Sequence, residues 1–187
     1  MTQKPDTAKP DSLRPPRHPN GGDWMLFGAI TVLGVGLDLW SKQAIFAWLP
    51  ETQTGQYTLI DGFLQFILRE NTGAAFSLFA GMTWMFIAIS VGTLLVLNTL
   101  FVLGKLTPRL TLAALACMNA GIVGNLYDRL FNEGRVRDFI DVYVGSYHWP
   151  TFNVADSLLC IGVGILMFVS VTAPTDQTPA SPQTKGS

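Results

Sequence analysis

The segment TWMFIAISVGTLLVLNTLFVL, residues 83–103, contains no charged residue and presents no polar face to water. It lies within a longer charge-free stretch of 34 residues, Asn71–Gly104. A helix that crosses a bilayer needs about 20 predominantly apolar residues, so this segment predicts a membrane-spanning helix. A buried helix of a water-soluble bundle is the alternative, which is disfavoured because such a helix keeps a polar stripe on its outer side.

The composition of the whole chain agrees with a membrane protein. Of its 187 residues 49% are hydrophobic and only 13% are charged, whereas an ordinary soluble domain carries roughly 25% charged residues. The formal net charge of −1 offers no positive excess for binding nucleic acid. Two cysteines and two histidines are too few for a disulfide scaffold and argue against a zinc site.

Charge-poor stretches predict an all-α membrane protein with four transmembrane helices. Their approximate bounds are Trp24–Ile45, Met82–Leu103, Leu110–Tyr127 and Val154–Val171. Residues 24–171 then form a single membrane domain. We expect the tails 1–23 and 172–187 to be disordered, because they are rich in proline and poor in apolar residues.

Four spans place both termini on the same side of the membrane, and the basic residues predict which side. Seven belong to the side of the termini: Lys4, Lys9, Arg14, Arg17, Lys105, Arg109 and Lys185. Four belong to the opposite side: Arg69, Arg129, Arg135 and Arg137. Because cytoplasmic segments carry an excess of lysine and arginine, we expect cytoplasmic termini and outward-facing segments 46–81 and 128–153.

The first outer segment is more than a linker between two helices. Residues Tyr57–Glu70 mix aromatic and β-branched side chains around Asp61-Gly62, a pattern that is typical of a short β-hairpin. We therefore expect a small extracytoplasmic sheet on the outer membrane surface. The edges of such a sheet could receive an extended peptide by strand addition.

Ionisable groups in or beside membrane helices are costly, and each is therefore a candidate functional residue. Asp38 and Lys42 are four residues apart on one helical face, which predicts a structural ion pair, although Lys42 could instead act as a general base. Asn125, Asp128 and Arg129 end the third span, where they could stabilise the helix end or contact a substrate. A relay of Asp38, Lys42 and Asp128 would indicate a small ion-coupled transporter or channel, but polar residues gather at span ends rather than mid-span.

Two carboxylates of the second outer segment are candidates for acid–base catalysis. Asp138 precedes Pro150 and Asp156 follows it, so the chain could bring both back to the outer membrane face. Asn153 would cap the fourth helix, which also offers a purely structural explanation for Asp156 in its first turn. Two carboxylates in a semi-buried site cannot both ionise easily, so one could activate water while the other polarises a carbonyl, without a metal or cofactor. Asp141 remains an alternative to Asp138.

Five motifs follow one another among the predicted spans. They are Asp38 with Lys42; Asn71-Thr72-Gly73-Ala74-Ala75-Phe76-Ser77; Gly124-Asn125-Leu126-Tyr127-Asp128-Arg129; Val136-Arg137-Asp138-Phe139; and Phe152-Asn153-Val154-Ala155-Asp156-Ser157. In this order they resemble the bacterial lipoprotein signal peptidases (signal peptidase II). Each motif alone is weak, but five in order across residues 24–171 are specific.

The resemblance implies an aspartic endopeptidase of the bacterial inner membrane, with its active site facing the periplasm. Members of this family remove the signal peptide from diacylglyceryl-modified prolipoproteins by cleaving before the lipidated cysteine. The implied partners are therefore these precursors and membrane lipid. Catalysis is assigned by the resemblance to Asp138 and Asp156, which sets Asp141 aside.

Further roles follow from the same resemblance. It implies substrate-binding or supporting positions at Asn71, Gly73, Asn125, Asp128, Arg129 and Asn153. The pair Asp38 and Lys42 maps to a structural role. A small sheet and a short, mobile outer helix or loop that embrace the substrate are also implied, and residues 46–70 and 139–149 are the candidates for them.

Overall fold

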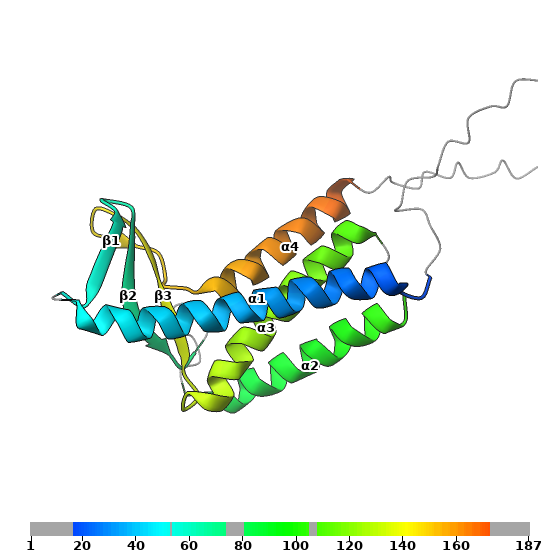
Figure 1. Ribbon diagram of the computed structural model, residues 1–187, viewed down its shortest axis with the longest axis horizontal. Coiled ribbons are helices and arrows are strands. Elements are labelled where there is room, and N and C mark those ends of the chain that lie inside the picture. Colours follow the sequence, from blue (N-terminus) through cyan, green and yellow to red (C-terminus); the bar gives the residue numbers. More distant parts are fainter. Residues whose placement is uncertain (1–16, 53, 74–80, 105–107, 173–187) are drawn as a thin grey trace, which may run out of the picture.

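The computed structural model describes residues 17–52, 54–73, 81–104 and 108–172. In this part of the chain, four long helices are joined to a small antiparallel sheet (Figure 1). The helices are α1 (Gly21–Trp48), α2 (Thr83–Val102), α3 (Arg109–Phe131) and α4 (Val154–Thr172). The strands are β1 (Gln56–Ile60), β2 (Leu64–Asn71), β3 (Val136–Val144) and β4 (Tyr147–His148), and the short 3-10 helix η2 (Leu49–Glu51) follows α1.

The four helices confirm the predicted membrane spans and extend some of their bounds. Each is long and apolar enough to cross a bilayer. Helix α1 begins at Gly21 rather than Trp24, because Asn20 and Asp23 cap each other's backbone N–H groups. Helix α3 continues past Tyr127 to Phe131. Several predictions fall outside the described residues. They concern most of both tails, positions 74–77 of the second motif, and five of the basic residues counted above: Lys4, Lys9, Arg14, Lys105 and Lys185.

Helix α3 is the central helix of the bundle, since it packs against α1, α2 and α4 (Figure 1). Glycines allow α4 to approach it closely. A Cβ atom on Gly121 of α3 would collide with the carbonyl oxygen of Ala155. A Cβ atom on Gly162 of α4 would lie 2.6 Å from the carbonyl oxygen of Ala114. This close approach brings the first turn of α4 beside the polar end of α3.

Apolar packing joins α1, α2 and α3, while the outer faces of the bundle remain apolar. Phe27 of α1 stacks on Phe101 of α2, with ring centroids 4.4 Å apart, and both contact a buried cluster that includes Leu112 of α3. Trp84 and Val171, in contrast, are 80% and 85% exposed. Such exposure is unfavourable in water but suits contact with lipid chains.

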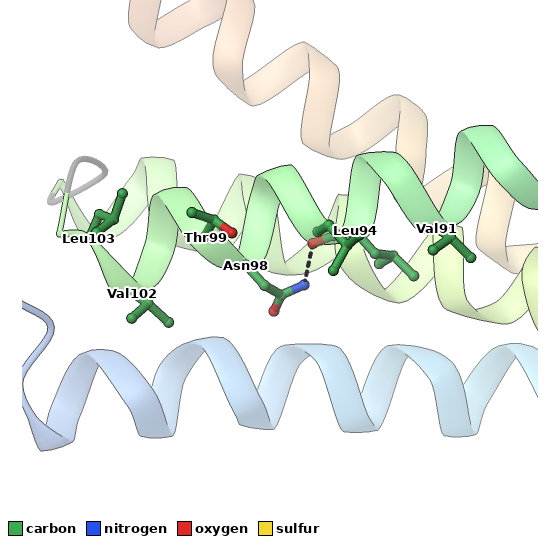
Figure 2. Close-up of a pocket in the computed structure, with 7 residues that line it drawn as sticks. Val91, Leu94, Asn98, Thr99, Val102 and Leu103 are labelled. Atoms are coloured by element: carbon green, nitrogen blue, oxygen red, sulfur yellow. Dashed lines mark hydrogen bonds between the residues drawn. The ribbon is translucent and has the colours of Figure 1, made fainter.

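A shallow groove of about 580 Å³ runs along α2 (Figure 2). Its lining contains no titratable side chain. The amide of Asn98 lies in it and donates to the carbonyl oxygen of Leu94 at 2.7 Å and to Oδ1 of Asn119 at 3.0 Å. Asn98 thereby links α2 to α3 within the span, and the groove itself offers no acid, base or nucleophile.

The outer segments form a four-stranded antiparallel sheet in the order β1-β2-β3-β4, at one end of the helix bundle (Figure 1). Strands β1 and β2 are the predicted hairpin, and Gly62 in its turn adopts a φ of 72°, which glycine tolerates best. Strand β3 pairs with β2 so that Asp138 faces Arg69 across the ladder. Residues 139–149, which with 46–70 are the candidates for the small sheet and the short outer helix or loop, belong mostly to β3 and β4, because their β-branched and aromatic residues favour an extended strand.

Candidate active site

Asp138 lies in β3, and its side chain is buried, with an exposed fraction of 3%. Two amides surround its carboxyl group. Nδ2 of Asn153 donates to Oδ1 at 2.7 Å, and Nδ2 of Asn71 lies 3.4 Å from Oδ2. The sheet positions Asn71, since β2 ends there beside the first residue of β3. Asp138 is therefore held by one short and one long amide contact.

Asp156 lies in the first turn of α4, where Asn153 caps the helix. The backbone N–H of Asp156 donates to Oδ1 of Asn153 at 2.9 Å, and the backbone N–H of Asn153 donates to Oδ2 of Asp156 at 3.2 Å. This reciprocal pair is a capping box. In addition, Nδ2 of Asn125 on α3 donates to Oδ1 of Asp156 at 2.8 Å. The predicted cap is present, and both oxygens of Asp156 accept a hydrogen bond.

The structure brings the two aspartates together on one cavity. Phe152 forms an antiparallel bridge with Ile140 of β3, which returns the chain to the sheet just before α4 begins. Asn153 consequently contacts both carboxyl groups. Both aspartates line a cavity of about 630 Å³. Its remaining lining comes from the end of β2 and the chain just after it, from α3, from the first residue of β3, from the segment 149–152 and from α4: Asn71, Gly73, Asn125, Arg129, Val136, Trp149, Pro150, Thr151, Phe152, Ser157, Leu159, Cys160 and Ile161.

The environment of Asp138 moves the loss of its proton from acidic pH to near neutrality. Burial away from water, followed by the nearby negative charge of Asp156, raises the pKa of Asp138 from its usual 3.8 to about 7. The hydrogen bonds from Asn153 and Asn71 act in the opposite direction but are weaker influences. A shared site with one protonated and one ionised carboxyl group can supply both a general acid and a general base.

A buried ionic network lies behind the cavity. Nζ of Lys42 is 2.8 Å from Oδ2 of Asp38 and 3.3 Å from Oδ2 of Asp128, and all three side chains are fully buried. Asp128 also pairs with the guanidinium of Arg137 at 2.7 Å. Oδ1 of Asp38 accepts the backbone N–H of Ala155 at 2.8 Å. The network therefore ties α1, α3 and β3 to the start of α4, and the ion pair expected between Asp38 and Lys42 is present.

Arg129 diverges from its neighbour Asp128 and turns toward the cavity. Its guanidinium donates to the carbonyl oxygens of Gly73 at 3.3 Å and of Asn125 at 3.4 Å, and it lies over the ring of Phe86 at 5.0 Å. Its Nε atom is buried and has no hydrogen-bond partner among the residues that the structure describes. Arg129 is therefore a cation at the cavity wall with donor capacity left over.

Asp141, the alternative partner, lies at a different place. Its buried carboxylate accepts from Nε2 of Gln65 at 2.6 Å and contacts Nδ1 of His148 at 2.9 Å, beside a separate hollow of about 420 Å³. Sequence reasoning missed this cluster, because the strand pairing that joins Gln65 to Asp141 cannot be read from spacing. Among the described residues, no group of three histidine, cysteine or acidic side chains gathers where it could hold a metal ion.

Comparison with known proteins gives a consistent result. Residues 30–172 match the family model described as signal peptidase (SPase) II. The chain is 37% identical over 147 residues to the lipoprotein signal peptidase of Francisella tularensis subsp. novicida (strain U112), an alignment that covers 76% of this chain and 89% of that protein. It is 34% identical over 158 residues to the lipoprotein signal peptidase of Yersinia pestis (strain Pestoides F), covering 82% and 89% of the two chains.

A solved structure shows the same architecture. A bacterial membrane enzyme determined at 2.3 Å resolution superposes with a TM-score of 0.73 and 28% sequence identity, covering 83% of this chain and 93% of that one. The family match extends over more than half of the chain and includes all five motifs. With four apolar helices and a polar cavity at one end, this multi-pass bacterial membrane protein belongs to the signal peptidase II family of proteases.

Proposed function

We propose that this protein removes the signal peptide from diacylglyceryl-modified prolipoproteins by cleaving before the lipidated cysteine, with Asp138 and Asp156 activating a water molecule. The observation that carries the proposal is the convergence of these two carboxyl groups on one cavity. The relatives compared above are lipoprotein signal peptidases. The cavity wall continues along α4 as Leu159, Cys160 and Ile161, which suits a substrate that remains partly in the bilayer.

The proposed reaction needs one ionised and one protonated carboxyl group. The ionised carboxylate takes a proton from water as the water oxygen bonds to the scissile carbonyl carbon. The protonated carboxyl group gives its proton to the carbonyl oxygen, which produces a neutral gem-diol. The C–N bond then breaks as the amide nitrogen receives a proton from the carboxyl group that had gained one. A hydroxyl proton returns to the other carboxylate, and a carboxylic acid and an amine leave.

Other cavity residues are suited to hold the peptide in place. The guanidinium of Arg129 already donates to backbone carbonyl oxygens of the chain, and the carbonyl oxygens of an extended substrate are acceptors of the same kind. Asn71 accepts the backbone N–H of Gly73 at 2.9 Å, which shapes the turn at the cavity rim. We propose that these three residues bind the substrate backbone near the scissile bond.

The proposed location is the inner membrane, with the cavity on the periplasmic side and both termini in the cytoplasm. A signal peptide is an apolar helix, and the lipid on its cysteine cannot leave the bilayer cheaply. Acidic groups at the end of the helix bundle would meet the scissile bond where it already lies, with membrane lipid around the helices. Water can reach a cavity at this end more easily than one at mid-span.

Mass spectrometry of a lipidated precursor incubated with the purified protein tests the proposed function. We expect the wild-type protein to release the signal peptide, whereas Asp138→Asn and Asp156→Asn each slow cleavage by roughly a hundred-fold to ten-thousand-fold, the usual contribution of an acid or base. Asp141→Asn is the matched control in the same strand, and it should still cleave because Asp141 lies beside the separate hollow. Normal processing by Asp138→Asn or Asp156→Asn would reject the assignment.

A further inference from the structure

The amide of Asn125 connects the buried ionic network to the aspartate pair. Its Oδ1 accepts from Nζ of Lys42 at 3.1 Å and from Nδ2 of Asn153 at 3.1 Å. Its Nδ2 donates to Oδ1 of Asp156 at 2.8 Å. The side chain of Asn125 is therefore polarised, with its oxygen toward a cation and its nitrogen toward an anion.

Lys42 and Nδ2 of Asn153 together determine which way this amide points, since both donate to its oxygen. An ammonium group has three N–H donors and no acceptor, so only the oxygen of Asn125 can face it. Reversing the amide would place an NH2 group against the ammonium and a carbonyl oxygen against Asp156. Asp38 and Asp128 hold the ammonium from its other sides at 2.8 and 3.3 Å. Because Lys42 is fully buried, its charge cannot turn away.

The orientation of the amide makes the two aspartates unequal. Asp156 receives an N–H donor on each oxygen, from the side chain of Asn125 and from the backbone of Asn153. Among the described residues, Asp138 receives one short bond, from Asn153, and one long contact of 3.4 Å, from Asn71. Hydrogen bonds donated to a carboxylate favour its ionised form. The pKa of Asp138, raised to about 7 by burial and by the charge of Asp156, agrees with a proton on that residue.

We propose that Lys42 is a positioning residue that acts through Asn125: together with Asn153 it orients and polarises the Asn125 amide so that Asp156 is the ionised, water-activating member of the pair and Asp138 carries the proton. This inference rests on the proposed function and goes further by dividing the two catalytic roles. It also gives Lys42 a second role, the positioning of Asn125, in addition to neutralising the charges of Asp38 and Asp128. A purely structural Lys42 would affect folding but would leave the division of roles unchanged.

The pH profile of kcat/KM for cleavage of a lipidated precursor separates these two possibilities. In Lys42→Met the amide of Asn125 loses the charged one of the two donors that hold its oxygen and keeps only Asn153, and in Asn125→Ala the donor to Asp156 is absent. We expect both variants to move the acidic limb of the profile, where the base becomes protonated, upward by about one pH unit or more. This corresponds to a loss of about ten-fold in rate on that limb. The alkaline limb should move less.

Asp38→Asn is the matched control, since Asp38 contacts the same ammonium but not Asn125. It should lower the thermal stability in detergent and leave the acidic limb in place. The double variant Lys42→Met/Asn125→Ala should shift the limb no further than the larger single shift, because both substitutions remove one chain of contacts. If Lys42→Met fails to fold, Lys42→Leu, which is also neutral and has no N–H donor in its side chain, takes its place in the comparison.

The results distinguish this inference from the proposed function. A folded Lys42 variant that cleaves with the wild-type pH profile would overturn the role of Lys42 while the peptidase activity stands. Fully additive shifts in the double variant would also overturn it, because Lys42 would then act independently of Asn125. Absence of cleavage by the wild-type protein would reject the proposed function, and this inference with it.

Discussion

At the scale of single residues, the raised pKa of Asp138 predicts how activity depends on pH. In the proposed reaction Asp138 must carry a proton to act as the acid, and its pKa of about 7 places the loss of that proton near neutrality. We therefore expect kcat/KM for precursor cleavage to fall as the pH rises through about 7. A profile without this fall in kcat/KM at alkaline pH would mean that another group supplies the proton. That result would contradict the role of Asp138.

The same pKa has a consequence for stability that is independent of activity. Between its usual 3.8 and about 7, Asp138 holds a proton in the folded state and releases it on unfolding, so its contribution to stability falls as the pH rises through that window. At about pH 8 the folded protein carries a buried charge that Asp138→Asn lacks. Thermal unfolding in detergent should show the variant to be more stable there, by on the order of 2–4 kcal/mol, with a smaller difference at about pH 5.

The sequence predicted individual pairs better than it predicted networks. Helical spacing alone indicated the contact between Asp38 and Lys42, and the cap formed by Asn153 followed from its place before an apolar run. The orientation of Asn125 depends on residues from α1, α3 and α4 at once. Such a convergence has no local signature, because spacing along the chain says nothing about how three helices meet.

At the scale of elements, the glycines of α4 predict where the bundle is sensitive to substitution. Gly162 faces α3, and a Cβ atom there would lie 2.5 Å from Cγ of Met118 and 2.6 Å from the carbonyl oxygen of Ala114. Gly164, one half-turn further along, has open space at the same position. We expect Gly162→Ala to destabilise the protein by about 1–3 kcal/mol through overpacking, measured as a lower melting temperature in detergent.

Gly164→Ala is the matched control, because it adds the same methyl group to the same helix without a collision. It should be neutral or slightly stabilising, since alanine favours a helix more than glycine does. Equal melting temperatures for the two variants would mean that α3 and α4 do not pack as closely as the structure shows.

Helices and strands with a strong sequence pattern were predicted correctly, and those with a weak pattern were not. Long charge-free stretches indicated all four helices, and Asp61-Gly62 indicated the β1–β2 hairpin. Strand β3 was not recognised, because its charged residues Arg137, Asp138 and Asp141 interrupt the apolar alternation. Those charges are stabilised by partners on α3, α4 and β2, so tertiary contacts rather than local propensity determine this strand.

At the scale of the whole molecule, the fold separates an apolar bundle from a polar end. The sheet lies at one end of the helices (Figure 1), and residues of β2, β3 and the first turns of α4 line the cavity. The ionic network of Lys42 joins α1 to α3 and to the start of α4. The site needs water and polar backbone, whereas the helices need lipid. Placing the two aspartates that we propose as catalytic at this end would satisfy both requirements, and the buried network would cost less there than at mid-span.

The orientation of this polar end across the membrane is the remaining prediction. The excess of basic residues on the side of the termini predicts a periplasmic sheet. The test starts from a variant in which Cys117 and Cys160 are replaced with alanine. A single cysteine is then introduced either at Tyr147, which is 69% exposed and lies beyond the helices, or at His18, which is exposed and precedes α1. A membrane-impermeant maleimide should label Tyr147→Cys in intact spheroplasts and His18→Cys only after lysis. The reverse pattern would place the cavity in the cytoplasm, where it could not meet an exported precursor.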